Sequence, residues 1–179
     1  LPKKLLPHTR LKNSRPQMTT NPRASFRCGV LTLSDKGARG ERDDTSGPEL
    51  QTMLRAAGFS LAEYRIIADE QRLIEDTLTE WADSLQLDLI VTTGGTGVSP
   101  RDRTPEATRN VIDREVPGLA EAMRLASLAV TPQAVWSRAM AGIRGTTLIL
   151  NLPGSKKAAR ENLAAVLPAL VHGLEKIQG

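Results

Sequence analysis

The sequence predicts an α/β domain built in three layers, helix–sheet–helix, with a mostly parallel sheet. Apolar runs typical of buried strands alternate along the chain with amphipathic segments typical of helices. Two of these strands, ending near residues 93 and 152, run directly into glycine-bearing loops, as at ligand-binding edges of parallel sheets. At 179 residues the chain has the length of one domain with one core.

The chain opens its predicted domain with a strand and a helix. Residues 27–34 are largely apolar and predict the first strand, and a polar, glycine-bearing loop follows over 35–44. Ser46-x-x-Glu49 has the spacing of a capping box, so we expect a helix to begin there. Gly58 is the residue type that ends such a helix.

A second strand and helix follow. Residues 61–67 predict the strand. Asp69 is well placed to cap the next helix, whose apolar positions recur at spacings of four, three and four. These positions are Ile74, Leu78, Trp81 and Leu85.

A glycine-rich loop follows the third strand, which the apolar run 89–91 predicts. Gly94, Gly95 and Gly97 tolerate positive φ, allow close approach of a ligand and can turn successive amides toward an anion. Thr104-Pro105 is typical of an N-cap and first helical position, and the N-terminal end of a helix attracts anions.

Two interpretations of this loop stay open on composition alone. Arg101, Asp102 and Arg103 lie between loop and helix, and such a set suits a phosphate with a metal ion. A tight strand-to-helix turn with solvated charges is the alternative. The loop is neither a P-loop, because no Gly-Lys-Ser/Thr follows, nor a dinucleotide fingerprint, because Pro100 stands where that pattern needs glycine.

The second half predicts three helices and one strand. A helix over 105–113 is followed by one that starts at Pro117 and ends at Thr131-Pro132. Residues 146–152 predict the last strand. The second of the helices carries Leu119, Met123, Ala126 and Val130 on one face, and the C-terminal helix carries Leu163, Val166, Leu167, Leu170, Val171, Leu174 and Ile177.

The basic character of the chain comes from its first segment. Residues 1–27 hold seven Lys and Arg residues and no Asp or Glu, so the remainder has 17 basic against 20 acidic residues. Charge therefore gives no argument for nucleic acid binding. We divide the chain into a mobile basic tail, 1–25, and a folded domain, 26–179. Met18 is interpreted as the natural start, and a transit peptide is the alternative interpretation of the tail.

Cysteine content and hydropathy exclude other classes. Cys28 is the only cysteine and sits in an apolar pattern, so we expect a buried side chain in a reducing compartment. One Cys and two His make a common zinc site implausible. No apolar run approaches the ~20 residues of a membrane span. We expect a cytoplasmic protein without a membrane or nucleic acid partner.

The central stretch resembles the molybdopterin adenylyltransferase and gephyrin G-domain family of molybdenum cofactor biosynthesis. The residues that carry the resemblance are Thr93-Gly94-Gly95-Thr96-Gly97, Arg101-Asp102 and Thr104-Pro105-Glu106. Further matches, in order, are Ser34-Asp35, Asp44 with Gly47, Ile67-x-Asp69-Glu70, Arg114-Glu115-x-Pro117-Gly118, Ser137-Arg138 and Asn151-x-Pro153-Gly154-Ser155. Together they cover about residues 26–178, effectively the whole predicted domain.

The resemblance implies roles for particular residues. Asp69 and Asp102 correspond to catalytic carboxylates that would share a Mg²⁺ ion. Substrate-binding positions are Ser34, Asp35, Asp44, Gly47, Thr93, Gly94, Gly95, Thr96, Gly97, Arg101, Thr104, Pro105, Glu106, Ser137, Arg138, Asn151, Pro153, Gly154 and Ser155. For Arg138, a surface position with no specific role is an equal alternative to substrate binding. For Asp69, capping of the following helix is the alternative to a catalytic role.

The resemblance also implies an activity. The terminal phosphate of molybdopterin would attack the α-phosphate of ATP, giving adenylyl-molybdopterin and pyrophosphate. The alternative is a molybdopterin-binding or scaffold protein that does not adenylylate; a nucleotide-hydrolysing relative is a third class. The family suggests a homotrimer, and hand-over of product to a separate molybdate-inserting protein.

Overall fold

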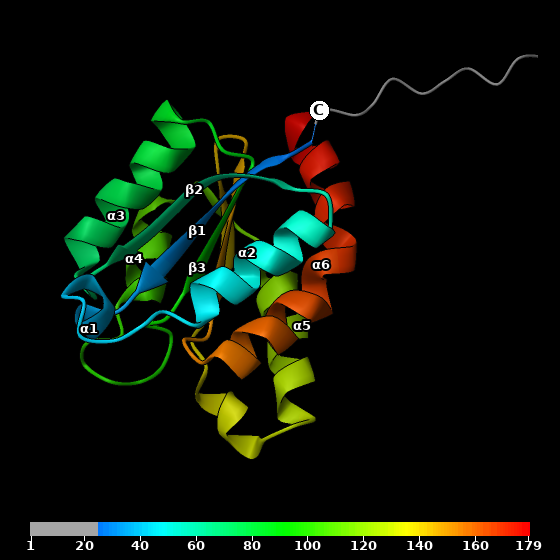
Figure 1. The fold of residues 1–179 in the computed structure, drawn as a ribbon. Coiled ribbons are helices and arrows are strands. Elements are labelled where there is room, and N and C mark those ends of the chain that lie inside the picture. The colour runs from blue at the N-terminus through cyan, green and yellow to red at the C-terminus, as the bar shows by residue number, and fades with distance from the viewer. Residues whose placement is uncertain (1–24) are drawn as a thin grey trace, which may run out of the picture.

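The structure is a computed structural model that describes residues 25–179. Its sheet has six strands in the order β2-β1-β3-β6-β5-β4 (Figure 1). The strands are β1 (Arg27–Leu33), β2 (Ser60–Ile67), β3 (Leu89–Thr93), β4 (Arg114–Glu115), β5 (Ala141–Arg144) and β6 (Thr147–Leu152). Strands β2, β1, β3 and β6 are parallel, whereas β5 and β4 are antiparallel additions. The predicted mostly parallel sheet is confirmed.

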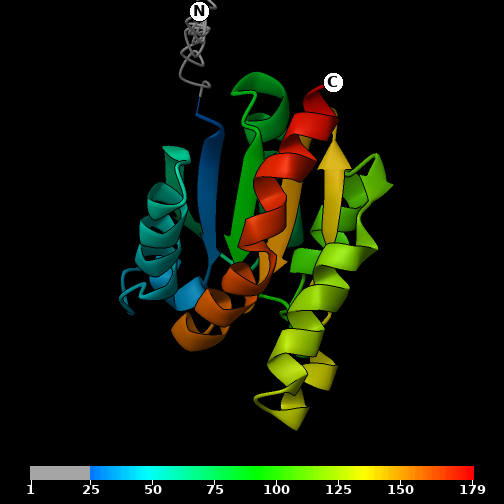
Figure 2. The same cartoon turned by 90° about the vertical axis from the view of Figure 1, so that its right-hand side faces the viewer.

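Helices cover both faces of this sheet. The helices are α1 (Asp35–Ala38), α2 (Ser46–Ala56), α3 (Gln71–Thr79), α4 (Thr104–Val111), α5 (Pro117–Leu128) and α6 (Lys156–Gln178), with a π-helical turn η1 (Glu80–Ser84) and a 3-10 turn η2 (Pro132–Trp136). Helices α2, α5 and α6 pack on one face, and α3, η1 and α4 pack on the other (Figures 1 and 2). The three-layer prediction is therefore confirmed.

The buried side chains of the central strands alternate between two cores, as the period of a strand requires. In β3, Leu89 and Val91 join the core under α2, α5 and α6, while Ile90 joins the core under α3 and α4. Both cores are fully buried at these positions, which explains why the strand is continuously apolar in sequence.

The chain changes direction across the sheet between β1 and β3. From β1 it goes to β2 on one side, and from β2 it returns past β1 to β3 on the other. The connections that leave the carboxyl ends of β1 and β3 therefore run in opposite directions. Such a topological switch point is where open α/β sheets bind ligands. At the opposite edge, Asp88 accepts a hydrogen bond from the amide of Arg27 (2.6 Å) and one from the side-chain amide of Gln178.

The predicted caps of helices α2 and α3 are wrong. Ser46 is the first residue of α2 rather than its cap, and the carboxylate of Asp44 accepts from the amides of Ser46 (3.0 Å) and Gly47 (3.1 Å). Asp69 does not cap α3, because Glu70 is the residue before that helix and no side chain caps it. The carboxylate of Asp69 turns instead toward β1.

Other predicted boundaries shift. Thr104 is already inside α4, and its hydroxyl donates to the carbonyl of Gly94 at 2.8 Å instead of capping. Helix α4 ends at Val111 rather than 113. Helix α5 ends at Leu128, so Val130 lies beyond it and is exposed rather than part of its buried face.

The short strands β4 and β5, η2 and the π-helical turn were not predicted. The burial of Cys28, which is fully inaccessible, agrees with its predicted place in the core and raises the pKa of its thiol to about 11. Within residues 25–179, no helix is both long and apolar enough to span a bilayer. Except for Ser25, the predicted basic tail, with its proposed start at Met18, lies outside the described residues.

Candidate functional site

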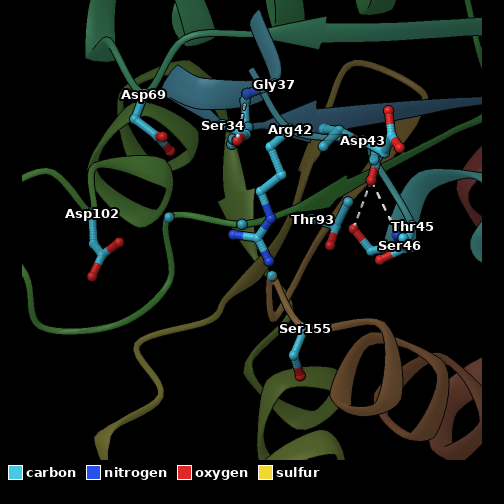
Figure 3. A pocket seen from close by; sticks show the side chains of 16 residues that line it. Ser34, Gly37, Arg42, Asp43, Thr45, Ser46, Asp69, Thr93, Asp102 and Ser155 are labelled. Atoms are coloured by element: carbon cyan, nitrogen blue, oxygen red, sulfur yellow. Dashed lines mark hydrogen bonds between the residues drawn. The ribbon is translucent and has the colours of Figure 1, made fainter. Parts of the chain in front are cut away.

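A cavity of about 350 Å³ opens at the switch point (Figure 3). Its walls come from the end of β1, the loop before α2, Asp69 after β2, the glycine loop after β3 and the turn before α6. These segments are far apart in sequence and meet because the parallel strands end at one edge of the sheet.

The cavity brings together nine of the residues that the sequence predicted for the site. They are Ser34, Asp44, Asp69, Thr93, Gly94, Gly95, Asp102, Gly154 and Ser155. Asp69 and Asp102, the two carboxylates predicted to share a Mg²⁺ ion, both line this cavity, although they follow different strands.

Asp69 is held by a hydrogen bond from the first residue of α1 and retains one available oxygen. Its Oδ2 accepts from the amide of Asp35 at 3.0 Å, and its Oδ1 has no hydrogen-bond partner among residues 25–179. Burial raises the pKa of Asp69, and the nearby charges of Asp35 and Asp102 act in the same direction. A carboxylate in this setting gains from a nearby cation.

Asp102 is oriented by the loop that carries it. Its Oδ2 accepts from the amide of Ser99 at 2.8 Å, and its other oxygen has no partner within the described part of the chain. A Cβ at Gly97 would lie 2.9 Å from Oδ2, so a larger residue at position 97 would require this carboxylate to shift. Each of the two aspartates thus presents one unpaired oxygen.

These aspartates suit a magnesium ion whose coordination is completed by substrate. Mg²⁺ prefers carboxylate oxygens and commonly takes one or two of them together with substrate phosphates and water. Among residues 25–179, no group of three or more His, Cys, Asp or Glu side chains is arranged to hold a metal by itself. The two unpaired aspartate oxygens would be the carboxylate ligands of the ion, and phosphate oxygens and water would supply its remaining ligands.

Asp35 does not line the cavity but ties its walls together. Its carboxylate binds the guanidinium of Arg101 through contacts of 2.7 and 3.1 Å, and it also accepts from the amide of Asp69 at 3.0 Å. The hydrogen bond from Arg101 holds the pKa of Asp35 below its usual range. Arg101 is therefore engaged by protein and is not a free cation in this structure.

Backbone donors face the cavity from two loops. The amide of Gly94 is already used, because it donates to the carbonyl of Leu152 at 3.1 Å. The amides of Gly95 and Gly154 have no acceptor among residues 25–179. Gly94 (φ 108°) and Gly95 (φ 62°) both adopt left-handed backbone. Ser155 caps α6 through the amide of Ala158, so this helix directs its positive end toward the cavity.

Asp44 fixes the wall formed by the start of α2. It accepts hydrogen bonds from the hydroxyls of Thr32 (2.5 Å) and Tyr64 (2.7 Å) and from the first amides of α2. Burial would raise its pKa, but these donors together outweigh burial and lower it. Gly47 lies behind this carboxylate, where a Cβ would overlap Asp44 and Thr32. Asp44 therefore acts in this structure as a structural anion.

A second cavity, of about 290 Å³, collects four other predicted residues. These are Thr96, Gly97, Ser137 and Pro153, and they meet there with residues of α5, η2 and α6. The predicted site residues are thus divided between two cavities, and the glycine loop after β3 contributes to the walls of both.

Arg138 holds that loop from behind. Its guanidinium donates to the carbonyls of Gly97 and Asp102, each at 2.6 Å, and pairs with the carboxylate of Glu106. Burial opposes ionisation of Glu106, but the hydrogen bond from Arg138, a backbone hydrogen bond and the nearby positive charges together outweigh burial and lower the pKa of that carboxyl. All three guanidinium nitrogens of Arg138 are engaged by protein groups, so the structure places this pair in support of the loop.

Three predicted residues lie in the core. Thr104 and Pro105 are buried at the start of α4. Asn151 is fully buried in β6, where its amide nitrogen donates to the hydroxyls of Thr92 (3.1 Å) and Thr108 (2.9 Å). The structure does not bring Asn151 into either cavity.

The sequence reasoning missed several residues that line the main cavity. They are Thr32, Gly37, Arg42, Asp43, Thr45 and Ser46. All but Thr32 lie in, or directly beside, the polar segment over 35–44 that follows the first predicted strand. The position of that segment after a strand of the central sheet is the signal that could have identified them.

Comparison with known proteins assigns the domain to a family. Residues 29–172 match the family described as "Probable molybdopterin binding domain". The chain is 46% identical over 153 residues to a molybdopterin adenylyltransferase of Helicobacter pylori, covering 84% of this chain and 87% of that protein. It is 44% identical over 157 residues to the Escherichia coli K12 protein of the same name, covering 84% and 80%.

Larger proteins and solved structures contain the same domain. The chain is 44% identical over 156 residues to Dictyostelium discoideum gephyrin. The matched region makes up 22% of the length of that gephyrin. The crystal structure of the molybdopterin biosynthesis enzyme MoaB from Thermus thermophilus superimposes with a TM-score of 0.82 at 58% identity. That match covers 86% of this chain and 97% of the Thermus chain.

Proposed function

This chain belongs to the molybdopterin-binding domain family, and from that premise we propose that it is a molybdopterin adenylyltransferase of molybdenum cofactor biosynthesis. One observation carries the proposal. Asp69, Asp102 and the glycine loops before α4 and α6 line one cavity at the switch point of the sheet. That combination offers metal-binding carboxylates and unpaired amides to phosphate groups.

The reaction exchanges one phosphoric anhydride bond for another. An oxygen of the terminal phosphate of molybdopterin forms a bond to the α-phosphorus of ATP, and the bond from that phosphorus to the β-phosphate oxygen breaks. Pyrophosphate leaves with the electron pair. Such a transfer asks the protein for alignment and charge neutralisation rather than for a covalent intermediate.

Asp69 and Asp102 are the residues that would hold Mg²⁺, through the oxygens that have no protein partner. Negative charge builds up on the pyrophosphate leaving group during the reaction, and a bound Mg²⁺ would neutralise part of that charge. The raised pKa of Asp69 supports this role, because a desolvated carboxylate binds a cation at little further cost in hydration.

The backbone supplies the remaining contacts in the main cavity. The amides of Gly95 and Gly154 would donate to phosphate oxygens, helped by the positive end of α6. Asp35, Arg101, Glu106 and Arg138 would fix the loop geometry in which these donors act. The core residue Asn151 would stabilise the strand beneath the site.

Pyrophosphate release tests the proposal directly. Purified protein is mixed with ATP and Mg²⁺, with and without molybdopterin, and pyrophosphate is measured by a coupled assay. We expect release only when all three are present, and loss of release on chelation of Mg²⁺. Tight molybdopterin binding without release would make the protein a binding or scaffold member, and release without the pterin would make it a nucleotide hydrolase.

Three finer features belong to the same proposal. We place the reaction in the cytoplasm because ATP is its substrate. We expect a homotrimer, and an exposed apolar patch supports self-association: Leu125, Val130, Val135 and Trp136 are each more than half exposed near the end of α5 and η2. The adenylylated product would pass to a separate molybdate-inserting protein.

A further inference from the structure

The main cavity has a marked imbalance of charge. Four carboxylates line it, those of Asp43, Asp44, Asp69 and Asp102, and Arg42 supplies the one cationic side chain among its described lining residues. ATP and the terminal phosphate of molybdopterin are polyanions, so carboxylates alone would repel them. A metal between Asp69 and Asp102 offsets part of this repulsion. Arg42 is the protein group available to offset more of it.

The loop that carries Arg42 is fixed on both sides of it. Gly40 (φ 71°) turns the chain after α1, and the amide of Glu41 donates to the carbonyl of Lys36 at 2.9 Å. On the other side, Asp44 is anchored to Thr32 by a bond of 2.5 Å. Figure 3 shows the side chain of Arg42 extending from this loop into the cavity, with the metal-binding aspartates on one side and the start of α2 on the other.

The guanidinium of Arg42 is unpaired. It forms no hydrogen bond or ion pair within residues 25–179. Three other arginines are engaged by carboxylates: Arg39 binds Glu41, Arg101 binds Asp35 and Arg138 binds Glu106. A guanidinium offers five donors in a planar fork that matches two oxygens of a phosphate. An unpaired fork inside an acidic, phosphate-sized cavity lacks its complementary anion.

We propose that Arg42 is a substrate-binding residue that receives a phosphate group in this cavity. The inference rests on the proposed adenylyl transfer for the identity of the phosphates, which belong either to the nucleotide or to the pterin. Arg42 and the metal-binding aspartates approach the cavity from different walls. A phosphate chain could therefore be neutralised by cations from two directions, which fixes its position as well as its charge.

The chain provides a matched control for the test. Arg39 lies three residues earlier in the same loop and is also exposed, but its guanidinium is bound to Glu41 at 2.7 Å and it does not line the cavity. Arg42→Gln and Arg39→Gln therefore remove the same charge from the same loop. Arg42→Lys keeps the charge and loses the fork. Because Arg42 has no protein partner among the described residues, its substitution should leave the thermal midpoint within about 2 °C of wild type.

Binding of ATP, inorganic pyrophosphate and molybdopterin is measured by titration calorimetry for all four proteins, alongside KM and kcat for pyrophosphate release. We expect Arg42→Gln to weaken binding of at least one phosphate ligand by about ten- to a hundredfold, the range for a charge-assisted hydrogen bond. Arg42→Lys should recover part of the loss, and Arg39→Gln should stay within about twofold of wild type. Loss with ATP and pyrophosphate assigns Arg42 to the nucleotide, and loss with molybdopterin alone assigns it to the pterin phosphate.

The two proposals fail in different ways. If wild type binds these ligands but releases no pyrophosphate, the adenylyl transfer proposal fails, and the binding data still decide the role of Arg42. If wild type turns over and Arg42→Gln matches Arg39→Gln in every titration and in KM, the role of Arg42 is overturned while the activity stands. Wild-type protein that binds none of the three ligands overturns both.

Discussion

Asp35 and Asp69 each donate their backbone amide to the other's carboxylate, at 3.0 Å in both directions. This reciprocal pair joins the end of β1 to the end of β2. Arg101 extends the connection to the loop after β3 through its ion pair with Asp35. Three strand ends are thereby linked by charged groups, and the carboxylate of Asp69 is oriented without a helix cap.

The pair predicts a pH effect. In the proposed reaction Asp69 would bind the metal in its ionised form. Its pKa is raised first by burial and also by the charge of Asp35, so activity should fall as pH decreases through that raised pKa. Asp35→Asn removes a negative charge and should lower the pKa of Asp69, moving the acidic limb of kcat/KM to lower pH. A profile recorded at saturating Mg²⁺ checks this, and a limb that moved upward would contradict it.

Substitution of the two cavity aspartates should affect turnover more than affinity. Asp102→Ala and Asp69→Asn each remove a carboxylate that we propose binds the metal and acts mainly in the transition state. We expect kcat to fall on the order of a hundredfold with little change in KM for ATP. Asp76→Asn serves as the control, because Asp76 lies on α3 in a surface pair with Arg72. Normal turnover of Asp102→Ala would remove that residue from the mechanism.

Arg138 should act through the loop rather than on the substrate. Its guanidinium joins the carbonyls of Gly97 and Asp102 to Glu106, and a lysine cannot span these three acceptors. Arg138→Lys should therefore lower kcat by at least about tenfold while changing the Kd of ATP much less. It should also reduce stability by roughly 1–3 kcal/mol.

Arg144→Lys is the matched control for that experiment. Arg144 also makes a forked pair, with Asp83, and donates to the carbonyl of Val111, but away from the cavity. We expect this variant to lose comparable stability and to keep its kcat. Equal loss of kcat in both variants would mean that general destabilisation, not loop geometry, explains the effect at Arg138.

Asp44 should contribute stability that depends on pH. Its folded-state pKa is lowered, so its contribution is present above the ordinary carboxyl pKa and is lost as pH falls through the lowered folded value. Asp44→Asn should thus reduce the free energy of unfolding by about 2 kcal/mol at pH 7, with the difference shrinking in strong acid. Urea unfolding at several pH values measures it; a difference independent of pH would exclude the ionised carboxylate as the cause.

Gly29 in β1 should not tolerate a methyl group. An added Cβ would lie 2.7 Å from ring atoms of Trp81 and 2.8 Å from Leu87. Gly29→Ala should cost roughly 1–3 kcal/mol of stability through overpacking. Gly173→Ala in α6 is the counterpart, because an added Cβ there meets nothing within 4 Å and should stabilise by about 0.5–1 kcal/mol. Thermal unfolding should move the two midpoints in opposite directions.

The parallel part of the fold was predictable because β1 and β3 are buried on both faces of the sheet. Strands buried in this way are largely apolar along their whole length, and that pattern is visible in the sequence. The antiparallel edge was not. Strand β4 has two residues and β5 has four, and β5 includes Gly142, packed tightly against Ile112. Such strands are defined by their neighbours rather than by their own pattern, because β5 pairs with β6 and β4 pairs with β5.

The sequence predicted which strand ends lie beside the cavity, but it did not reveal the partners of the side chains there. Asp69 and Asp102 reach one cavity because the topology brings strand ends together. Sequence spacing does not reveal that Arg138 and Arg101 are already occupied by carboxylates and carbonyls, or that Asn151 turns into the core. Arg42 was overlooked because a lone loop arginine has no signature until the cavity around it is known.

The meeting of Arg27 and Gln178 at Asp88 has a practical consequence for fusion and immobilisation. Both ends of the folded domain emerge together, at the edge of the sheet opposite the cavity (Figures 1 and 2). An affinity tag, a fluorescent reporter or a surface tether attached beyond either position would leave the mouth of the cavity unobstructed. The same geometry lets this domain be carried as one segment of a longer polypeptide, as its 22% share of Dictyostelium gephyrin illustrates.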